Sequence, residues 1–188
     1  MAKMKLNVGD DAPNFELVDQ NGQKHTLSMY KGKKIVLYFY PKDNTPGCTK
    51  EACGMRDNYD AFTKAGVVIL GVSADSFISH KIFAREHSLP FTLLSDDDHY
   101  ILEKYGAWTT KSIFGRIMMG IERITYLIDE RGRIMKIYPK VKPAEHARQI
   151  LKDLGIEVEN KEKKEKAKTK AKVKISLLKK LKLKRQKK

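Results

Sequence analysis

The chain has 188 residues, of which 41% are hydrophobic and 9% aromatic, so it can form one domain of ordinary size with a buried core. Two cysteines are too few for a disulfide-stapled scaffold or a four-cysteine zinc site. No apolar run approaches the ~20 residues of a membrane-spanning helix, and the start lacks a stretch of signal-peptide type. We therefore expect no transmembrane segment and a protein of a reducing compartment, the cytoplasm.

The positive charge is concentrated at the C-terminal end. The net charge of the chain is +15. Residues 159–188 hold 14 Lys and one Arg against three Glu, a net of +12, which leaves +3 for residues 1–158. We expect a folded domain over residues 1–158 and a disordered or loosely helical lysine-rich tail over residues 159–188. The tail could be a solubilising extension, a non-specific nucleic-acid binder or a membrane-surface helix, and its lack of aromatic residues argues against base stacking.

Hydrophobic patterns along residues 1–158 predict alternating strands and helices. Strands are expected at residues 15–18, 24–27, 34–40, 67–72, 123–128 and 133–138. Helices are expected at residues 49–64, 79–87, 97–105 and 143–154. Asn21-Gly22 is typical of a hairpin turn, Asp96 is a candidate helix cap, and Pro143 and Gly155 are candidate helix boundaries. These elements predict an α/β domain with a mixed central sheet and helices on both faces.

Residues 41–53, PKDNTPGCTKEAC, follow a buried strand and open a helix, which is where open α/β sheets place their sites. Thr45 can be the N-cap and Pro46 the first helical residue. Cys48 then lies in the first turn, where free N–H groups and the helix dipole favour a thiolate. Since the thiolate is the nucleophile, cysteine chemistry is expected here, although a small buried hydrophobe is the alternative for Cys48.

The second cysteine, Cys53, lies on another side of the same helix. At about 100° per residue, Cys48 shares a buried stripe with Ala52, Met55, Tyr59 and Phe62, whereas Cys53 lies about 140° away on a polar face. Cys53 is either an inert core thiol or a reactive partner. Five residues rise about 7.5 Å, beyond the roughly 7 Å that a disulfide allows between Cα atoms. A Cys48–Cys53 disulfide therefore requires the first turns of the helix to unwind.

Other residue types give weaker signals. The five histidines have no recognised metal-ligand spacing, so surface or capping roles are expected for them: His25, His80, His87, His99 and His146. Trp108 and the Met118-Met119 pair are interpreted as packing or loop residues. The chain has no P-loop or dinucleotide fingerprint, and we expect neither a metal nor another cofactor.

At Pro41, Thr45 and Cys48 the sequence resembles the peroxiredoxins, whose active-site pattern is Pro-xxx-Thr-xx-Cys. The string YFYPKDNTPGCTKEACGMRD is similar to the peroxiredoxin Q type, also called bacterioferritin comigratory protein, with Cys53 as its second cysteine. The resemblance extends through GDDAPNFEL, FTLLSD and GIERITYLID and covers roughly residues 6–155. It implies a thioredoxin-like fold and thiol-dependent peroxidase activity, and the basic tail falls outside it.

The resemblance also implies roles for single residues. Cys48 would attack the peroxide and become a sulfenic acid. Thr45 would hydrogen-bond thiolate and peroxide, and Pro41 would shield the site. Arg123 would stabilise the thiolate and polarise the peroxide.

Cys53 would resolve the sulfenic acid as an intramolecular disulfide, which thioredoxin or a similar thiol reductant would reduce. Hydrogen peroxide and organic hydroperoxides are the implied substrates, and we expect a monomer. Two alternatives stay open. One is a thioredoxin-like body that presents its basic tail to nucleic acid or membranes. The other is a thiol–disulfide oxidoreductase, although that class prefers Cys-x-x-Cys.

Overall fold

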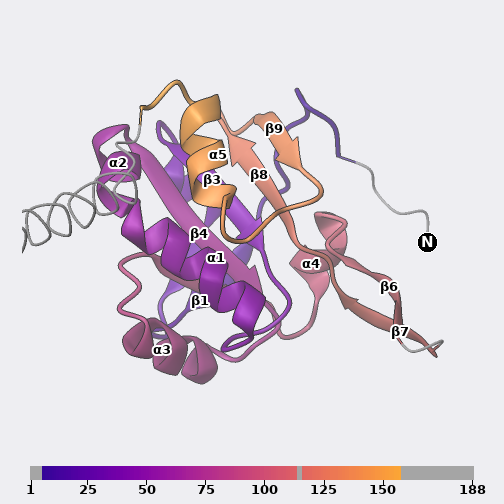
Figure 1. The fold of residues 1–188 in the computed structure, drawn as a ribbon. Coiled ribbons are helices and arrows are strands. Elements are labelled where there is room, and N and C mark those ends of the chain that lie inside the picture. Colours follow the sequence, from indigo (N-terminus) through magenta and orange to yellow (C-terminus); the bar gives the residue numbers. More distant parts are fainter. Residues whose placement is uncertain (1–5, 114–115, 158–188) are drawn as a thin grey trace, which may run out of the picture. The chain divides into compact units, whose positions relative to one another are not determined.

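The computed structural model describes residues 6–113 and 116–157, and the predicted tail at residues 159–188 lies outside this range. A seven-stranded sheet has the order β2-β1-β5-β4-β3-β8-β9 (Figure 1). Its strands are β1 Glu16–Asp19, β2 Lys24–Thr26, β3 Lys34–Phe39, β4 Val67–Ser73, β5 Thr92–Ser95, β8 Ile124–Ile128 and β9 Ile134–Tyr138. β3, β4 and β5 are parallel, whereas β1, β2, β8 and β9 join antiparallel, so the predicted mixed sheet is confirmed.

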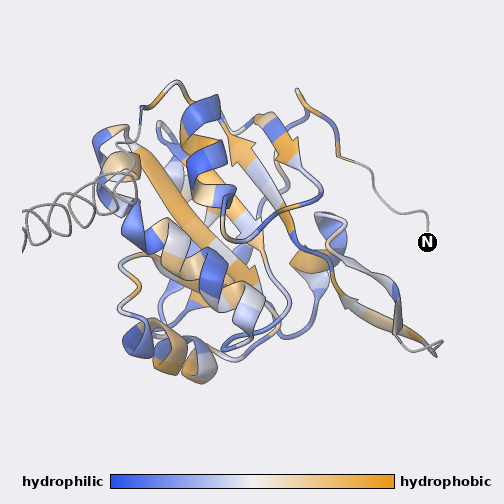
Figure 2. Cartoon of the chain, in the orientation of Figure 1, coloured by the Kyte–Doolittle hydropathy of each residue, from blue (hydrophilic) through white to orange (hydrophobic). Residues whose placement is uncertain are grey.

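Helices cover both faces of this sheet. They are η1 Leu27–Tyr30, α1 Pro46–Asp57, α2 Tyr59–Lys64, α3 Phe77–Glu86, α4 Tyr100–Lys104 and α5 His146–Asp153. One face packs side chains such as Leu37 and Phe39 against Leu102 of α4, and the opposite face buries Tyr38 and Val36 beneath α1, α3 and α5. Figure 2 shows the central strands as hydrophobic and the helices as striped, as the alternation of buried side chains requires. None of the described helices is long and apolar enough to cross a membrane.

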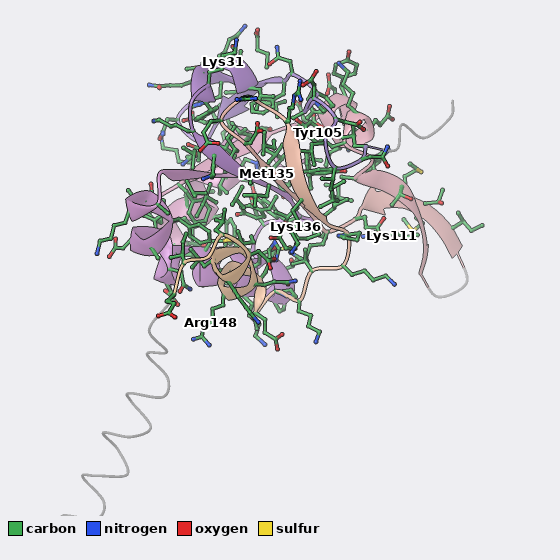
Figure 3. The ribbon with its side chains drawn as sticks, turned by 90° about the horizontal axis from the view of Figure 1, so that it is seen from above. Lys31, Tyr105, Lys111, Met135, Lys136 and Arg148 are labelled. Carbon is green, nitrogen blue, oxygen red and sulfur yellow. The ribbon has the colours of Figure 1, made fainter. Side chains whose placement is uncertain are left out.

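Side-chain hydrogen bonds join the outer elements to the core. Tyr105, labelled in Figure 3, is buried and donates its hydroxyl to the carbonyl of Pro13 (2.7 Å). Lys136 of β9, labelled in the same view, pairs with Asp153 at the end of α5 (2.8 Å). These contacts hold the N-terminal segment and the last helix against the sheet.

The prediction of one continuous helix at residues 49–64 is wrong, because two helices occupy this range. α1 ends at Asp57 and α2 begins at Tyr59, because the backbone of Asn58 leaves the helical range and its side-chain amide donates to the carbonyl of Gly54 (2.8 Å). A side chain that bonds locally competes with the helix. The start of α1 at Pro46 is confirmed.

The bounds of three other helices differ from the prediction. α3 spans Phe77–Glu86 rather than residues 79–87. α5 begins at His146 rather than at Pro143, since residues 143–145 form a turn. Gly155 follows α5 with a positive φ of 73°, the conformation that a helix-terminating glycine supplies. α4 begins at Tyr100 and its N-cap residue is His99 rather than the predicted Asp96, although the carboxylate of Asp96 accepts from the N–H groups of Ile101 (3.2 Å) and Leu102 (2.6 Å) in the first turn.

Three strands were not predicted. β5 has only four residues and therefore a weak alternation signal. β6 (Trp108–Ile113) and β7 (Arg116–Ile121) form an antiparallel two-stranded sheet that extends away from the main one in Figure 1. Met118 and Met119 are exposed on β7, so they are strand residues at the surface rather than core or loop residues.

Candidate active site

Cys48 lies in the first turn of α1. This helix follows the end of β3, where the chain leaves the sheet and enters the helix layer. The side chain of Cys48 is buried, together with Ala52 and Met55 of α1 and Phe62 of α2, as the predicted stripe requires, whereas Tyr59 of that stripe is only half-buried. Thr45 is the N-cap residue in extended backbone, as predicted, but its side chain caps nothing. Its hydroxyl instead donates to the carbonyl of Lys42 (2.9 Å), back into the preceding loop.

Arg123 reaches Cys48 from the residue before β8. Its Nη2 lies 3.2 Å from Cys48 Sγ, and its Nη1 donates to Oε2 of Glu51. A side chain at Gly47 would place its Cβ 3.3 Å from the same Nη2, so a glycine there leaves room for the guanidinium. One arginine thus links the predicted nucleophile to a carboxylate one helical turn further along α1.

Glu51 was missed by the sequence analysis, although its spacing of three residues from Cys48 puts it on the same helical face. The stripe was recognised only by its apolar members. Glu51 is fully buried, and this burial raises the pKa of its carboxyl to about 7 even though Arg123 opposes the shift. The carboxyl therefore changes charge near neutral pH while it stays in contact with Arg123.

His146 of α5 approaches the carboxyl of Glu51 from a second helix. Its Nε2 is 2.8 Å from Oγ1 of Thr125 and 3.9 Å from Oε1 of Glu51. Burial, and then the charge of Arg123, lowers the pKa of His146 to about 4, so the ring is neutral at pH 7 and forms no ion pair with Glu51. The predicted surface or capping role is wrong for His146 and for His80, because both rings are completely buried.

Three buried side-chain atoms in the described part of the chain have no hydrogen-bond partner: Tyr38 Oη, Glu51 Oε1 and His146 Nδ1. They belong to one neighbourhood. Tyr38 is paired across the sheet with Thr125, which contacts His146, and His146 approaches Glu51. Unpaired buried polar atoms are uncommon in folded proteins and concentrate at functional sites.

The loop at residues 41–45 is held by a second polar cluster. The carboxylate of Asp43 accepts from the hydroxyls of Tyr40 (2.7 Å) and Ser79 (2.7 Å) and lies 2.9 Å from Nδ1 of His80. The other ring nitrogen of His80 faces the carbonyl of Leu94 (3.2 Å). These contacts fix the chain just before Cys48, whereas Pro41 is half-buried at the start of the loop.

Cys53 is half-buried and, like Cys48, is a free thiol. α1 is unbroken between the two residues, so the structure keeps them about 7.5 Å apart along the helix axis. No structural feature tests the predicted unwinding, which stays a prediction.

A pocket of about 430 Å³ opens beside the start of α1. It is lined by Pro46, Gly47 and Lys50 of α1 and by residues 141–145. Within residues 6–113 and 116–157, no group of His, Cys, Asp and Glu side chains is arranged to hold a metal ion.

Comparisons with known proteins agree with this geometry. Residues 8–137 match the AhpC/TSA family. Peroxiredoxin Bcp of Bacillus subtilis is 50% identical over 154 residues, which cover 80% of this chain and 98% of that protein. A bacterioferritin comigratory protein of Xanthomonas campestris superposes with a TM-score of 0.72 at 38% identity, covering 75% of this chain and 90% of that one. Peroxiredoxin Q of Xylella fastidiosa superposes with a TM-score of 0.76 at 34% identity, covering 80% of this chain and 96% of that one.

These likenesses extend over nearly the whole length of the relatives and include the thioredoxin-like fold. The basic tail is not part of the match to the family. The chain therefore belongs to the AhpC/TSA family and, within it, to the peroxiredoxins of the Bcp or Q type, which are thiol-dependent peroxidases.

Proposed function

We propose that Cys48 is the peroxidatic cysteine of this enzyme and that Arg123 activates it. The observation that carries the proposal is the 3.2 Å contact between Arg123 Nη2 and Cys48 Sγ. A fixed guanidinium stabilises the thiolate, and it also stabilises the negative charge that develops on the departing oxygen. The thiolate attacks one peroxide oxygen, the O–O bond breaks, and the other oxygen leaves with a proton as water or an alcohol. Cys48 is then a sulfenic acid.

Thr45 and Pro41 complete the site in this proposal. The hydroxyl of Thr45 lies three residues before Cys48 and reaches the peroxide if it rotates away from the carbonyl of Lys42, its present partner. Pro41 has no N–H group and begins the loop that Asp43 anchors, so it shields the thiol without offering a competing donor.

Organic hydroperoxides are proposed as substrates beside hydrogen peroxide. The structure of the Xanthomonas campestris relative is described in terms of alkyl peroxide reduction activity. In this chain, the 430 Å³ pocket next to the start of α1 is lined by the apolar residues Pro46, Val141, Pro143 and Ala144, together with Lys50, Lys142 and Glu145. An alkyl group attached to the peroxide can occupy such a pocket.

Cys53 is the proposed resolving cysteine. Its thiolate attacks the sulfur of the Cys48 sulfenic acid, the S–O bond breaks, and water leaves as the disulfide forms. Because α1 separates the two sulfurs, this step includes unwinding of its first turns. A thioredoxin-type dithiol then reduces the disulfide. One chain holds both cysteines, so a monomer is sufficient, and a reducing compartment such as the cytoplasm suits the cycle.

The test is peroxide consumption by the wild type and by Cys48→Ser, with hydrogen peroxide or cumene hydroperoxide as oxidant and dithiothreitol as reductant. We expect the wild type to consume both oxidants and Cys48→Ser to consume neither. Equal turnover in the two proteins would contradict the assignment of Cys48.

A second function is proposed for the tail, because residues 159–188 carry +12 of the net charge. Lysine-rich segments bind nucleic acid by neutralising phosphates, with an affinity that falls steeply as salt rises. Deletion of residues 159–188 is expected to abolish salt-sensitive binding to duplex DNA, measured by fluorescence anisotropy, and to spare peroxide turnover. Retention of DNA binding by the truncated chain would contradict the proposal.

A further inference from the structure

The outward side of α3 carries large apolar side chains that the fold does not use. α3 buries His80 and Phe83 against the sheet. On its exposed side, Phe77, Ile78 and Ile82 retain 43%, 58% and 41% of their accessible surface. Ile78 and Ile82 are one helical turn apart and therefore adjacent on the surface. Figure 2 shows orange bands on α3 among the blue ones. We call Ile78 and Ile82 the α3 apolar face, since Phe77 lies about 100° from Ile78 and about 140° from Ile82 around the helix.

Two cations lie on one side of the α3 apolar face, and the exposed Glu86 lies on the other side, about 40° from Ile82. At about 100° per residue, Lys81 lies about 60° and Arg85 about 20° from Ile78 around the helix. Both side chains are exposed, and neither forms an ion pair with any part of the chain that the structure describes. An apolar centre with unpaired positive charges fits a partner whose apolar surface has an acidic rim.

α3 is directly connected to the redox site. Asp43, two residues before Thr45, bonds to Ser79 and His80 of α3, and Asn44 bonds to Glu86 (3.1 Å) near its end. From the other side, Arg56 of α1 donates to the carbonyl of His87, the residue that caps α3 (2.7 Å).

Cys53 lies three residues before Arg56, and Figure 1 shows α1 and α3 on the same face of the sheet. A protein seated on α3 is therefore beside the helix that holds both cysteines.

We propose that the α3 apolar face, with Lys81 and Arg85, is the docking surface for the dithiol protein that reduces the Cys48–Cys53 disulfide. The proposal rests on the peroxidase cycle above. The partner is a thioredoxin-type protein whose reactive cysteine is surrounded by apolar side chains and acidic groups.

The electron transfer is a thiol–disulfide exchange. The partner's thiolate attacks the sulfur of Cys53, which is the more exposed cysteine, and forms a mixed disulfide while Cys48 leaves as a thiolate. The partner's second thiol then attacks the sulfur of the partner's first cysteine in the mixed disulfide, which releases Cys53. Cys48 and Cys53 gain the two electrons and the partner is left as a disulfide.

The test compares a protein reductant with a small one. In Ile78→Ser/Ile82→Ser, kcat/KM for thioredoxin is expected to fall about thirtyfold, the size of one interface hot spot. Turnover supported by dithiothreitol is expected to be unchanged, because that reductant needs no docking surface. Lys81→Glu/Arg85→Glu should also lower kcat/KM for thioredoxin and reduce its dependence on salt.

A matched control removes the same amount of exposed apolar surface elsewhere. Met118 and Met119 of β7 are 55% and 49% exposed, close to the values for Ile78 and Ile82. Met118→Ser/Met119→Ser is expected to keep wild-type turnover with both reductants.

Several results would overturn the proposal. One is an unchanged kcat/KM for thioredoxin in Ile78→Ser/Ile82→Ser, and another is a wild type that dithiothreitol sustains but thioredoxin does not. A wild-type dimer that these substitutions dissociate, measured by sedimentation, would assign the face to a second copy. Loss of binding to vesicles of anionic phospholipid, with thioredoxin turnover intact, would assign it to a membrane. A wild type that is inactive even with dithiothreitol would instead refute the proposed function.

Discussion

Two buried polar clusters support the start of α1, and they differ in how completely their atoms are paired. In the Asp43 cluster, made of Asp43, Tyr40, Ser79 and His80, both carboxylate oxygens of Asp43 have partners. In the Cys48 cluster, made of Cys48, Glu51, Arg123 and His146, Oε1 of Glu51 and Nδ1 of His146 have none. The first cluster holds the loop, and the second holds the thiol.

The difference in pairing changes the charge of the two carboxyls. Burial alone would raise the pKa of Asp43, but hydrogen bonds from His80, Ser79 and Tyr40 hold it below its ordinary value. Glu51 has Arg123 alone to oppose its burial, so its pKa rises to about 7. Asp43 is thus a permanent anion that anchors the loop, whereas Glu51 is an acid whose charge depends on pH beside the reactive sulfur.

The largest expected effect comes from breaking the Asp43 cluster. His80→Leu leaves the buried Asp43 carboxylate without its imidazole hydrogen-bond partner, which should lower the free energy of unfolding by about 3 kcal/mol. Urea unfolding measures this loss of free energy. His87→Leu is the control, because His87 makes one partly exposed hydrogen bond to Asn44 and should cost only about 0.5–1.5 kcal/mol. Equal losses of unfolding free energy in the two variants would show that the Asp43 cluster stabilises the fold no more than the hydrogen bond of His87 does.

Removing the cation of the Cys48 cluster should act on the reaction. In Arg123→Met the thiolate and the departing oxygen lose their donor, so the rate constant for hydrogen peroxide is expected to fall about 10²–10³-fold. Competition with a reporter peroxidase measures this constant. The exposed Arg131→Met serves as the control and should react like the wild type. A rate within twofold of wild type in Arg123→Met would contradict the assigned role.

The titration of Glu51 predicts a pH-dependent stability. Its pKa is about 7 in the folded state and lies near the ordinary value of 4.5 for a glutamate when the chain unfolds. The stabilising contribution is therefore fully present below about pH 4.5 and is lost as pH rises through 7. The side chain in Glu51→Gln cannot titrate. The free energy of unfolding of this variant, relative to that of the wild type, should therefore rise by about 1–3 kcal/mol from pH 5 to pH 8.

Urea unfolding of both proteins at four pH values isolates this difference, because the other titrating groups are shared. A difference that stays constant from pH 5 to pH 8 would show that Glu51 does not titrate in this range.

The smallest effect is expected at Thr45, which touches neither cluster. Thr45→Val removes the hydroxyl that donates to Lys42 and should cost about 0.5–1.5 kcal/mol of stability. If the hydroxyl also contacts the peroxide, the rate with hydrogen peroxide falls further than in Thr45→Ser, which keeps the group. Equal rates in the two variants would remove Thr45 from the reaction.

The sequence predicted the start of α1 well and the buried polar clusters poorly. Pro46 and the position of Cys48 follow from local signals, since an N-cap, a proline and a periodic stripe act within one turn. Arg123 depends on a contact across 75 residues, and only the family resemblance pointed to it.

Glu51, His80 and His146 were missed for a related reason. Periodicity identifies buried positions by apolar residues, so a polar side chain buried by distant partners gives no signal. The β6–β7 hairpin has no Asn-Gly in its sequence, and among those of its residues whose side chains the structure describes only Ile121 is buried, so neither a turn signal nor a buried stripe marked it.

The most direct test of the central claim is the intact mass of the reduced protein after one equivalent of hydrogen peroxide, for the wild type, Cys53→Ser and Cys48→Ser. Our account predicts that the wild type loses two hydrogens, that Cys53→Ser gains one oxygen, and that Cys48→Ser does not react rapidly. Addition of oxygen to the wild type without a disulfide would contradict the role of Cys53. The absence of a rapid reaction in the wild type would contradict the account as a whole.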